Sequence, residues 1–415
     1  MKLLWLCNSA PGVVRAHISG KPASAVNWVD HVLAGLRQRG LTLRILYRGT
    51  AGSGVIDETC SYASFGEELP YVYRPELEAT FRQEIRSFAP DVIHSWGVEY
   101  NHALAMVNAA EAEGMLDRTV ASIQGLCGFI AEHYTDGLPE TVVNHSTFRD
   151  FVRKDNIRQQ QEKFFLRGKL EAQTIGKLHH VIGRTSWDHA RAKEWNSEIQ
   201  YHFCNETLRQ NFYEDVWNYE TCRKHSVFAS SCAYPVKGFH YLLEAMAHVR
   251  EVYPDTVITV TGASYLGGNW KAQLRRGSYE DYLAKLTKKY RLEDAVQFLG
   301  DLSAEDMKQA FLAANVFVLP STMENSPNSL GEAMLLGVPA VAADVGGVRN
   351  LLKDPEEGRI YSSGCVEALT EHILELFALE EQAAALGLAA REHGLRTHDP
   401  EKNLEALLHI YENLK

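Results

Sequence analysis

The chain lacks the features that would mark a disulfide-stapled, zinc-binding or membrane-spanning protein. Its seven cysteines (positions 7, 60, 127, 204, 222, 232 and 365) are odd in number, scattered and without CxxC spacing, which indicates reduced thiols and no zinc site. The apolar run Leu3–Cys7 is shorter than a signal-peptide core, and no stretch approaches the length of a bilayer span. These absences predict a cytoplasmic protein.

The chain also lacks an excess of positive charge. It carries 42 Lys and Arg against 53 Asp and Glu, a net charge of -11, which argues against nucleic acid as the main partner. With 45% hydrophobic and 23% charged residues it has the composition of a folded protein, and it contains no internal repeat or low-complexity tract. A chain of 415 residues is too long for one ordinary core, so two domains are expected.

Buried strands alternate with amphipathic helices along both halves of the sequence. The strand Leu3–Cys7 is followed by an expected long loop through Gly20, and the pattern restarts at Ser226–Ala229. This alternation predicts α/β domains with parallel sheets, in which ligands gather beyond the carboxyl ends of the strands. We predict a first domain at 1–204, a linker at 205–224, a second domain at 225–395 and a final helix at 396–415 that crosses back towards the first domain.

One α/β unit, residues 320–347, has the clearest pattern. The strand Val316–Leu319 stops at Pro320, and a helix begins after a polar loop, with Ser329 as expected N-cap and Glu332 completing a capping box. Gly337 ends this helix. Free N–H groups and the helix dipole make its amino terminus a predicted anion site.

Two carboxylates, Glu324 and Glu332, frame this unit. ENSPNSLGEAM (324–334) with LGVPAVAADVGG (336–347) resembles the Glu-x7-Glu motif of retaining, nucleotide-sugar-dependent glycosyltransferases of family 4. The resemblance implies the GT-B fold, two Rossmann-like domains facing each other across a cleft. It also implies that Glu324 lies by the donor sugar and Glu332 binds the ribose. The amides facing the diphosphate would be those of Asn328, Ser329 and Leu330. The simpler alternative is a capping Glu332 and an exposed loop acid at position 324.

Further donor contacts are implied elsewhere in the second domain. Lys237, in a Lys-Gly pair, matches a family residue that binds donor phosphates, whereas Cys232 stands where the family has a second cation. Arg184, from the first domain, is the candidate to replace that cation. The resemblance also implies contacts at Gly262 and Leu302. The alternative for Lys237-Gly238 is a plain surface turn.

The first domain matches the family only in outline. Gly20 stands alone where members have a Gly-Gly turn, DVIHSWG at 91–97 places His94 at a strand end, and Gln124 replaces a histidine near the donor sugar. These three residues are the predicted acceptor-side or sugar-side contacts. The amide of Gln124 can donate a hydrogen bond but cannot carry a proton as imidazole does. For His94 the alternative is a hydrogen-bonded strand-end histidine.

Residues 141–177 form a basic stretch with interleaved aromatic side chains. Such a stretch can lie on an anionic membrane, which would put the protein at the inner membrane face, or it can be a solvated helix face that covers the sheet.

Together these features predict a retaining, metal-independent glycosyltransferase with Glu324, Lys237 and Arg184 as catalytic residues. It would move a hexose-type sugar from a nucleoside-diphosphate sugar to a glycan or lipid-linked hydroxyl acceptor in polysaccharide or glycolipid biosynthesis. No loop carries a DxD-like carboxylate pair that would call for a metal. Two alternatives stay open: a degenerate nucleotide-sugar-binding protein, favoured by Cys232 and Gln124, and a sugar-nucleotide epimerase of the same fold.

Overall fold

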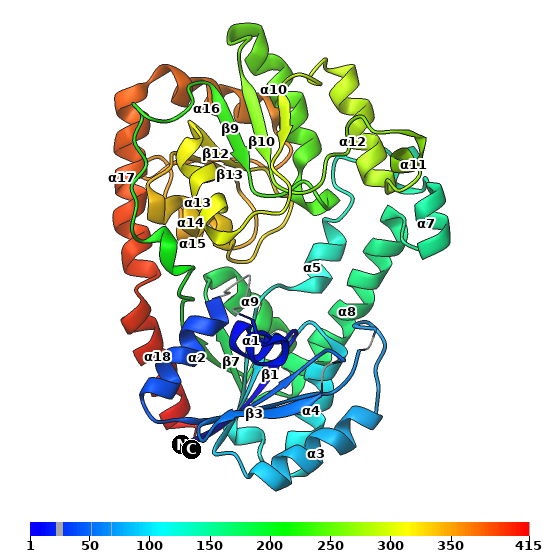
Figure 1. The fold of residues 1–415 in the computed structure, drawn as a ribbon, viewed down its shortest axis with the longest axis vertical. Coiled ribbons are helices and arrows are strands. Elements are labelled where there is room, and N and C mark those ends of the chain that lie inside the picture. Colours follow the sequence, from blue (N-terminus) through cyan, green and yellow to red (C-terminus); the bar gives the residue numbers. More distant parts are fainter. Residues whose placement is uncertain (22–27, 51, 68, 415) are drawn as a thin grey trace. The chain divides into compact units, whose positions relative to one another are not determined.

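The computed structural model describes residues 1–21, 28–50, 52–67 and 69–414. The chain forms two compact units (Figure 1). Unit 1 comprises Met1–Gly128, Phe164–Arg209 and His398–Lys415, and unit 2 comprises Phe129–Lys163 and Gln210–Thr397. None of the helices in the described ranges is both long enough and apolar enough to cross a bilayer.

Unit 1 is built on an eight-stranded sheet with the order β3-β4-β2-β1-β5-β6-β7-β8. All neighbours are parallel except the hairpin of β3 and β4. The strands are β1 Lys2–Cys7, β2 Thr42–Tyr47, β3 Ser53–Asp57, β4 Cys60–Ser64, β5 Val92–Trp96, β6 Thr119–Ser122, β7 His180–Gly183 and β8 Gln200–Phe203. Because β1 pairs with both β2 and β5, the chain winds from the centre towards both edges.

Helices cover both faces of this sheet, and β1 contributes to both cores. Leu3 and Trp5 pack with apolar residues of α2 and α18, whereas Leu4 and Leu6 pack with those of α3 and α4. This alternation explains why β1 is apolar from Leu3 to Cys7, because a central parallel strand is buried on both faces. The helices of unit 1 include α1 Gly12–Ser19, α2 Trp28–Gln38, α3 Glu76–Phe88, α4 Asn101–Ala112, α9 Ser186–Trp195 and α18 Pro400–Asn413.

Unit 2 is built on a six-stranded parallel sheet with the order β11-β10-β9-β12-β13-β14. The strands are β9 Ser226–Ala229, β10 Val257–Val260, β11 Val296–Phe298, β12 Val316–Leu319, β13 Ala340–Ala343 and β14 Arg359–Tyr361. Its helices include α6 Glu140–Val143, α7 Phe148–Arg153, α10 Phe239–Val252, α11 Trp270–Gln273, α12 Ser278–Lys289, α13 Ala304–Ala313, α14 Asn328–Leu336, α15 Val348–Leu351, α16 Val366–Ala378 and α17 Glu380–Thr397. Two parallel α/β sheets are the architecture that the sequence predicts.

The units divide the chain differently from the predicted domain boundaries. The stretch Phe129–Lys163 belongs to unit 2, although it falls within the first predicted domain. Hydrogen bonds hold it there: the Oγ1 of Thr322 donates to the carbonyl of His133 at 2.9 Å, and His240 binds the carbonyl of Asp136 at 3.1 Å. Helices α5 (Cys127–Glu132) and α8 (Ile157–Lys177) each begin in one unit and end in the other.

The prediction of a long loop after the first strand is wrong, because residues Gly12–Ser19 form helix α1. The helix begins at Pro11, whose side chain cannot cap it, and the carboxylate of Asp30 instead accepts from the N–H of Gly12 at 2.6 Å. This cap comes from a distant residue on α2, so no local pattern marks it. Gly20 ends the helix in the left-handed conformation, with φ of 66°.

Two buried histidines, His94 in unit 1 and His240 in unit 2, are hydrogen-bonded through both ring nitrogens. His94 has no exposed surface, and its ring nitrogens contact the hydroxyls of Tyr411 at 2.5 Å and Ser122 at 2.8 Å. His240 contacts the Tyr279 hydroxyl at 3.1 Å as well as the carbonyl of Asp136. Burial lowers the pKa of His94 to about 3 and that of His240 to about 4.

Both imidazoles therefore stay neutral in the folded protein at a pH where the unfolded chain, with a pKa of 6.5, takes up a proton. Their contribution to stability is complete above that value and is lost as the pH falls towards the folded-state pKa. We predict that the cost of His94→Gln, relative to the wild type, is about 2 kcal/mol smaller near pH 5 than near pH 7.5. Urea unfolding at both pH values measures this difference, and an equal cost at both would contradict it.

Candidate functional site

The loop between β12 and α14 carries the predicted donor-site residues. Helix α14 begins at Asn328, directly after its N-cap residue Pro327, and ends at Gly337 in the left-handed conformation. The end at Gly337 is as predicted, but the capping box is wrong. The N-cap lies two residues earlier than expected, at Pro327 instead of Ser329, so Ser329 lies inside the first turn and Glu332 lies further along the helix. The proline side chain cannot accept a hydrogen bond, but the carbonyl of Pro327 accepts from the N–H of Leu330 at 3.0 Å and from that of Gly331 at 3.2 Å.

Lys237 and Glu324 form an ion pair in this part of unit 2. The Nζ of Lys237 lies 2.6 Å from the Oε1 of Glu324, and the hydroxyl of Ser321 donates to the same oxygen at 2.8 Å. The lysine follows β9 and the glutamate follows β12, and these two strands are neighbours in the sheet. The Lys237 side chain is 33% exposed and that of Glu324 is 12% exposed, so the cation remains accessible to a ligand.

Two glycine turns hold the backbone on either side of this pair. A Cβ at Gly238 would lie 1.8 Å from the carbonyl oxygen of Pro320, and one at Gly346 would lie 1.8 Å from that of Glu324. Both glycines have positive φ, 63° and 51°. The N–H of Gly347 donates to the Glu324 carbonyl at 3.2 Å. This close packing fixes the position of the Glu324 backbone, from which the side chain extends.

The remaining predicted donor contacts also follow carboxyl ends of unit 2 strands. Gly262 follows β10 and pairs with Gly300, after β11, by an N–H to carbonyl bond of 2.9 Å. Leu302 is half-buried just beyond that bridge. On α14, Leu330 and Glu332 are buried, whereas Asn328 and Ser329 are half-buried. Their roles towards a ligand stay predictions.

Arg184, in unit 1, is already paired with a carboxylate that sequence reasoning missed. Its Nη1 lies 2.7 Å from the Oε2 of Glu206, and both side chains are buried. Gln124 donates to the other oxygen of Glu206 at 2.8 Å. Glu206 lies in the stretch predicted to be a linker, so nothing in its surroundings marked it. The guanidinium charge of Arg184 is thus neutralised within unit 1, and its predicted role as a diphosphate ligand is untested.

The acceptor-side residues of unit 1 have different environments. His94 is the hydrogen-bonded strand-end histidine of the alternative interpretation, because it has no exposed surface and both ring nitrogens have partners. Gly20 is exposed at the end of α1. Gln124 lines a pocket of about 260 Å³ at the carboxyl ends of β1, β5 and β6.

The same pocket contains Glu99, which sequence reasoning also missed. Its lining consists of Cys7, Asn8, Ser9, Pro11, Val29, Trp96, Glu99 and Gln124. One carboxylate oxygen of Glu99 accepts from Asn8 and the other from the N–H of Val98, both at 2.9 Å. Burial raises the pKa of Glu99. Its position just beyond a predicted strand end was the available sequence clue. A buried acid, two amide side chains and an indole can together bind a polyhydroxyl ring.

The cysteines of the chain are free thiols. Cys232, which stands in place of a cation, is buried, and this burial raises the pKa of its thiol to about 12. It therefore supplies no charge to a ligand near neutral pH. In the described ranges no group of three or more His, Cys, Asp or Glu side chains is arranged to hold a metal ion.

The fold of the two units is found in solved structures. Two Rossmann-like α/β domains of GT-B type are confirmed by solved structures that match over the whole chain. Sucrose-phosphate synthase from Thermosynechococcus elongatus has a TM-score of 0.71 at 17% identity, covering 100% of this chain and 99% of that one. HepE from Anabaena, solved with UDP-glucose, has a TM-score of 0.68 at 16% identity, covering 99% of each chain.

Residues 223–393 match the family described as "Glycosyl transferases group 1", which confirms the predicted resemblance for this part of the chain. The D-inositol 3-phosphate glycosyltransferase of Corynebacterium urealyticum is 28% identical over 43% of this chain and 41% of its own length. The sulfoquinovosyl transferase SQD2 of Arabidopsis thaliana is 34% identical over 37% of this chain and 28% of its own. The matched region thus spans about 40% or less of these curated relatives.

The glycine turns generate a stability prediction. Gly346→Ala combines left-handed backbone strain with overlap against a carbonyl, whereas Gly267→Ala meets the strain alone, because Gly267 has φ of 65° and no atom within 4 Å of an added Cβ. We expect Gly267→Ala to cost about 1 kcal/mol and Gly346→Ala at least about 3 kcal/mol. Chemical denaturation of both variants measures this, and equal costs would show that the loop around Glu324 is not tightly packed.

Proposed function

We propose that the chain is a retaining glycosyltransferase that moves a hexose-type sugar from a nucleoside-diphosphate sugar to a hydroxyl acceptor in glycan or glycolipid biosynthesis. The observation that carries this proposal is the Lys237–Glu324 pair, whose glutamate lies in the loop that leads into α14. A cation and a helix amino terminus, both beyond strand ends, are the groups that bind a diphosphate. The match of residues 223–393 to group 1 glycosyl transferases supports this assignment.

Lys237 would bind the diphosphate through its partly exposed ammonium group. The N–H groups of Asn328, Ser329 and Leu330 would face the same phosphates, and Glu332 would accept from the ribose hydroxyls. As the bond from the sugar C1 to the phosphate oxygen breaks, negative charge grows on the leaving group. Lys237 and the α14 dipole would stabilise this negative charge, which in other enzymes is stabilised by a divalent metal. We therefore propose that no metal is required.

Glu324 would orient the donor sugar and not attack it. Its Oε1 is engaged by Lys237 and Ser321, which weakens it as a nucleophile. Transfer would then occur on one face of the sugar. The acceptor oxygen bonds to C1 on the side that the diphosphate leaves, and the acceptor proton passes to a phosphate oxygen. The anomeric configuration is retained without a covalent enzyme intermediate.

The acceptor would bind in the pocket of unit 1 that Glu99, Asn8 and Gln124 line. These side chains offer both donors and acceptors to a ring that carries several hydroxyls, and Trp96 offers an apolar face. Similar proteins include a D-inositol 3-phosphate glycosyltransferase and a phosphatidylinositol monomannoside mannosyltransferase, and we propose an acceptor of the same polyol class, free or lipid-linked. The free thiols fit a reducing compartment, so we place the reaction in the cytoplasm.

The donor assignment predicts selective stabilisation by a nucleotide. One of UDP, GDP or ADP, or its sugar conjugate, should stabilise the wild type by about 2.7 kcal/mol at one hundred times its dissociation constant. The effect should resist EDTA. Lys237→Met, which removes the charge but keeps the chain length, should weaken binding at least about tenfold. Thermal-shift titration measures both.

Lys289→Met, on the exposed surface of α12, is the matched control and should bind like the wild type. If no nucleotide stabilises the wild type, or if Lys237→Met binds as well as the control, the donor site is wrongly assigned. Binding without any turnover would favour a degenerate binding protein.

The acceptor assignment predicts a separate kinetic effect. Glu99→Gln keeps the shape of the side chain but removes its acidic oxygen, so it should raise KM for a polyol acceptor about tenfold and leave KM for the donor unchanged. Initial rates at varied acceptor and donor concentrations measure the two constants, with the exposed Glu58→Gln as control. A change in the donor KM alone would overturn the assignment.

A further inference from the structure

Helix α7 presents its apolar side chains to solvent. Phe148 is 64% exposed, Phe151 78% and Val152 65%. Positions three and four apart lie on one face of a helix, so these side chains form a single apolar surface. A surface helix ordinarily turns such a face towards the core. Helix α7 is therefore turned the opposite way to an ordinary surface helix, with its apolar face towards solvent.

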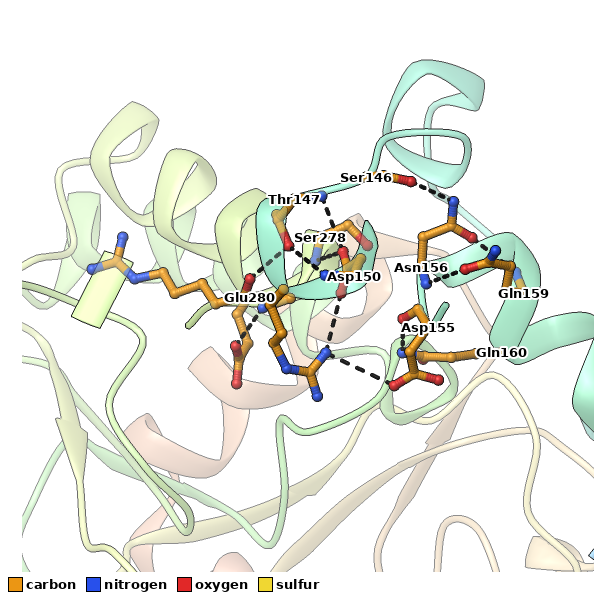
Figure 2. A network of polar contacts seen from close by, with 12 residues as sticks. Ser146, Thr147, Asp150, Asp155, Asn156, Gln159, Gln160, Ser278 and Glu280 are labelled. Atoms are coloured by element: carbon orange, nitrogen blue, oxygen red, sulfur yellow. Dashed lines mark hydrogen bonds and ion pairs between the residues drawn. The ribbon is translucent and has the colours of Figure 1, made fainter. Parts of the chain in front are cut away.

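The polar side of α7 is the one held against unit 2. Asp150 is buried, and its Oδ2 accepts from the N–H of Ser278 at 2.8 Å, while the hydroxyl of Thr147 donates to the carbonyl of Arg276 at 2.8 Å (Figure 2). Thr147 and Asp150 also complete a capping box. Rotating the helix to bury its phenylalanines would break this network and leave a buried carboxylate unpaired, which is costly. The outward apolar face is thus built into the fold.

The segment that anchors α7 adds further exposed apolar groups. Helix α11 leads directly into Arg276, and it carries Trp270, 65% exposed, with Leu274 following at 44%. We call Phe148, Phe151, Val152, Trp270 and Leu274 the α7–α11 face. In the described part of unit 2 the four most exposed large apolar side chains all belong to it. Scattered single apolar residues are normal on a surface, but a cluster of the most exposed ones indicates a binding face.

The charges around this face are positive although the chain as a whole carries -11. Arg153, Lys154 and Arg275 are exposed and have no ion-pair partner among the described residues. Three acids of the same segment are already engaged: Asp150 and Asp155 pair with neighbouring cations, and Glu280 accepts from the N–H of Gly277 at 2.8 Å. A basic rim around aromatic side chains complements a surface that is anionic outside and apolar beneath.

We propose that the α7–α11 face docks unit 2 onto an anionic membrane surface. The two phenylalanines, Val152 and Trp270 would enter the boundary between headgroups and acyl chains, and the three cations would lie among the phosphates. This narrows the membrane contact predicted for 141–177 to one face and adds a segment far away in the sequence. The docking is separate from the transfer chemistry, and it would bring the enzyme to a lipid-linked acceptor.

The test is flotation of the purified full chain with vesicles of phosphatidylcholine alone or with roughly one third phosphatidylglycerol. The wild type should bind the anionic vesicles and bind neutral ones at least about tenfold more weakly, and added salt should reduce binding. Phe148→Ser combined with Phe151→Ser should lower the partition coefficient at least about tenfold. Arg153→Gln with Lys154→Gln should abolish the preference for anionic lipid.

Matched controls come from the same unit. Val252→Ser with Leu388→Ser removes exposed apolar groups elsewhere, and Lys288→Gln with Lys289→Gln removes the same charge from α12. Both should bind vesicles like the wild type. If the wild type fails to bind, or if the serine variant binds as well as its control, the proposal is overturned and the face serves a protein partner. Stabilisation by the nucleotide should be equal in the wild type, the two test variants and the two controls. A loss of vesicle binding with unchanged nucleotide stabilisation is therefore distinct from a failure of the proposed donor site.

Discussion

The ion pair between Lys237 and Glu324 is the contact on which the interpretation of unit 2 depends. The two residues are 87 positions apart in sequence and follow two adjacent parallel strands, and the sheet pairing of β9 with β12 brings them together. Close packing at Gly238 and Gly346 then fixes the loop between β12 and α14, because neither position has room for a side chain. The ammonium group of Lys237 and the hydroxyl of Ser321 both bind the Glu324 carboxylate, and the N–H of Gly347 binds its carbonyl, so the charges are positioned without a ligand. Preorganised charge of this kind is what stabilises a departing diphosphate.

The two units use the same architecture but treat their charges in opposite ways. In unit 1 the cation Arg184 is buried against Glu206, and a second buried acid, Glu99, lies in the pocket and accepts from Asn8. In unit 2 the cation Lys237 is one-third exposed and its carboxylate is the more buried partner. An accessible cation suits an anionic donor, whereas a pocket with a protonatable acid and amides suits a neutral polyol. This difference between the units comes from the side chains at the strand ends, because the two sheets have the same architecture.

Local patterns were sufficient for much of the fold. The apolar runs of β1 and β12, the restart at Ser226 and the glycine that ends α14 all depend on neighbours in sequence, and all could be predicted. The missed helix α1 depends on a distant partner, because Asp30 caps it from another helix. The contact that holds α7 in unit 2 is also long-range, since the N–H of Ser278 donates to Asp150. At the site, the Glu-x7-Glu motif identified Glu324 and the Lys-Gly pair identified Lys237, but Glu99 and Glu206 have no motif. Their importance comes only from burial and from the residues that surround them.

The central claim is that the strand ends of unit 2 support turnover of a nucleotide sugar without a metal. The most direct measurement is release of nucleoside diphosphate from the stabilising donor in EDTA, with myo-inositol or glucose as acceptor, followed by NMR of the anomeric proton of the product. The account predicts acceptor-dependent release, a product with the anomeric configuration of the donor, and a rate at least about a hundredfold lower in Lys237→Met. An inverted product, or release that needs a divalent metal and is unchanged in Lys237→Met, would contradict it.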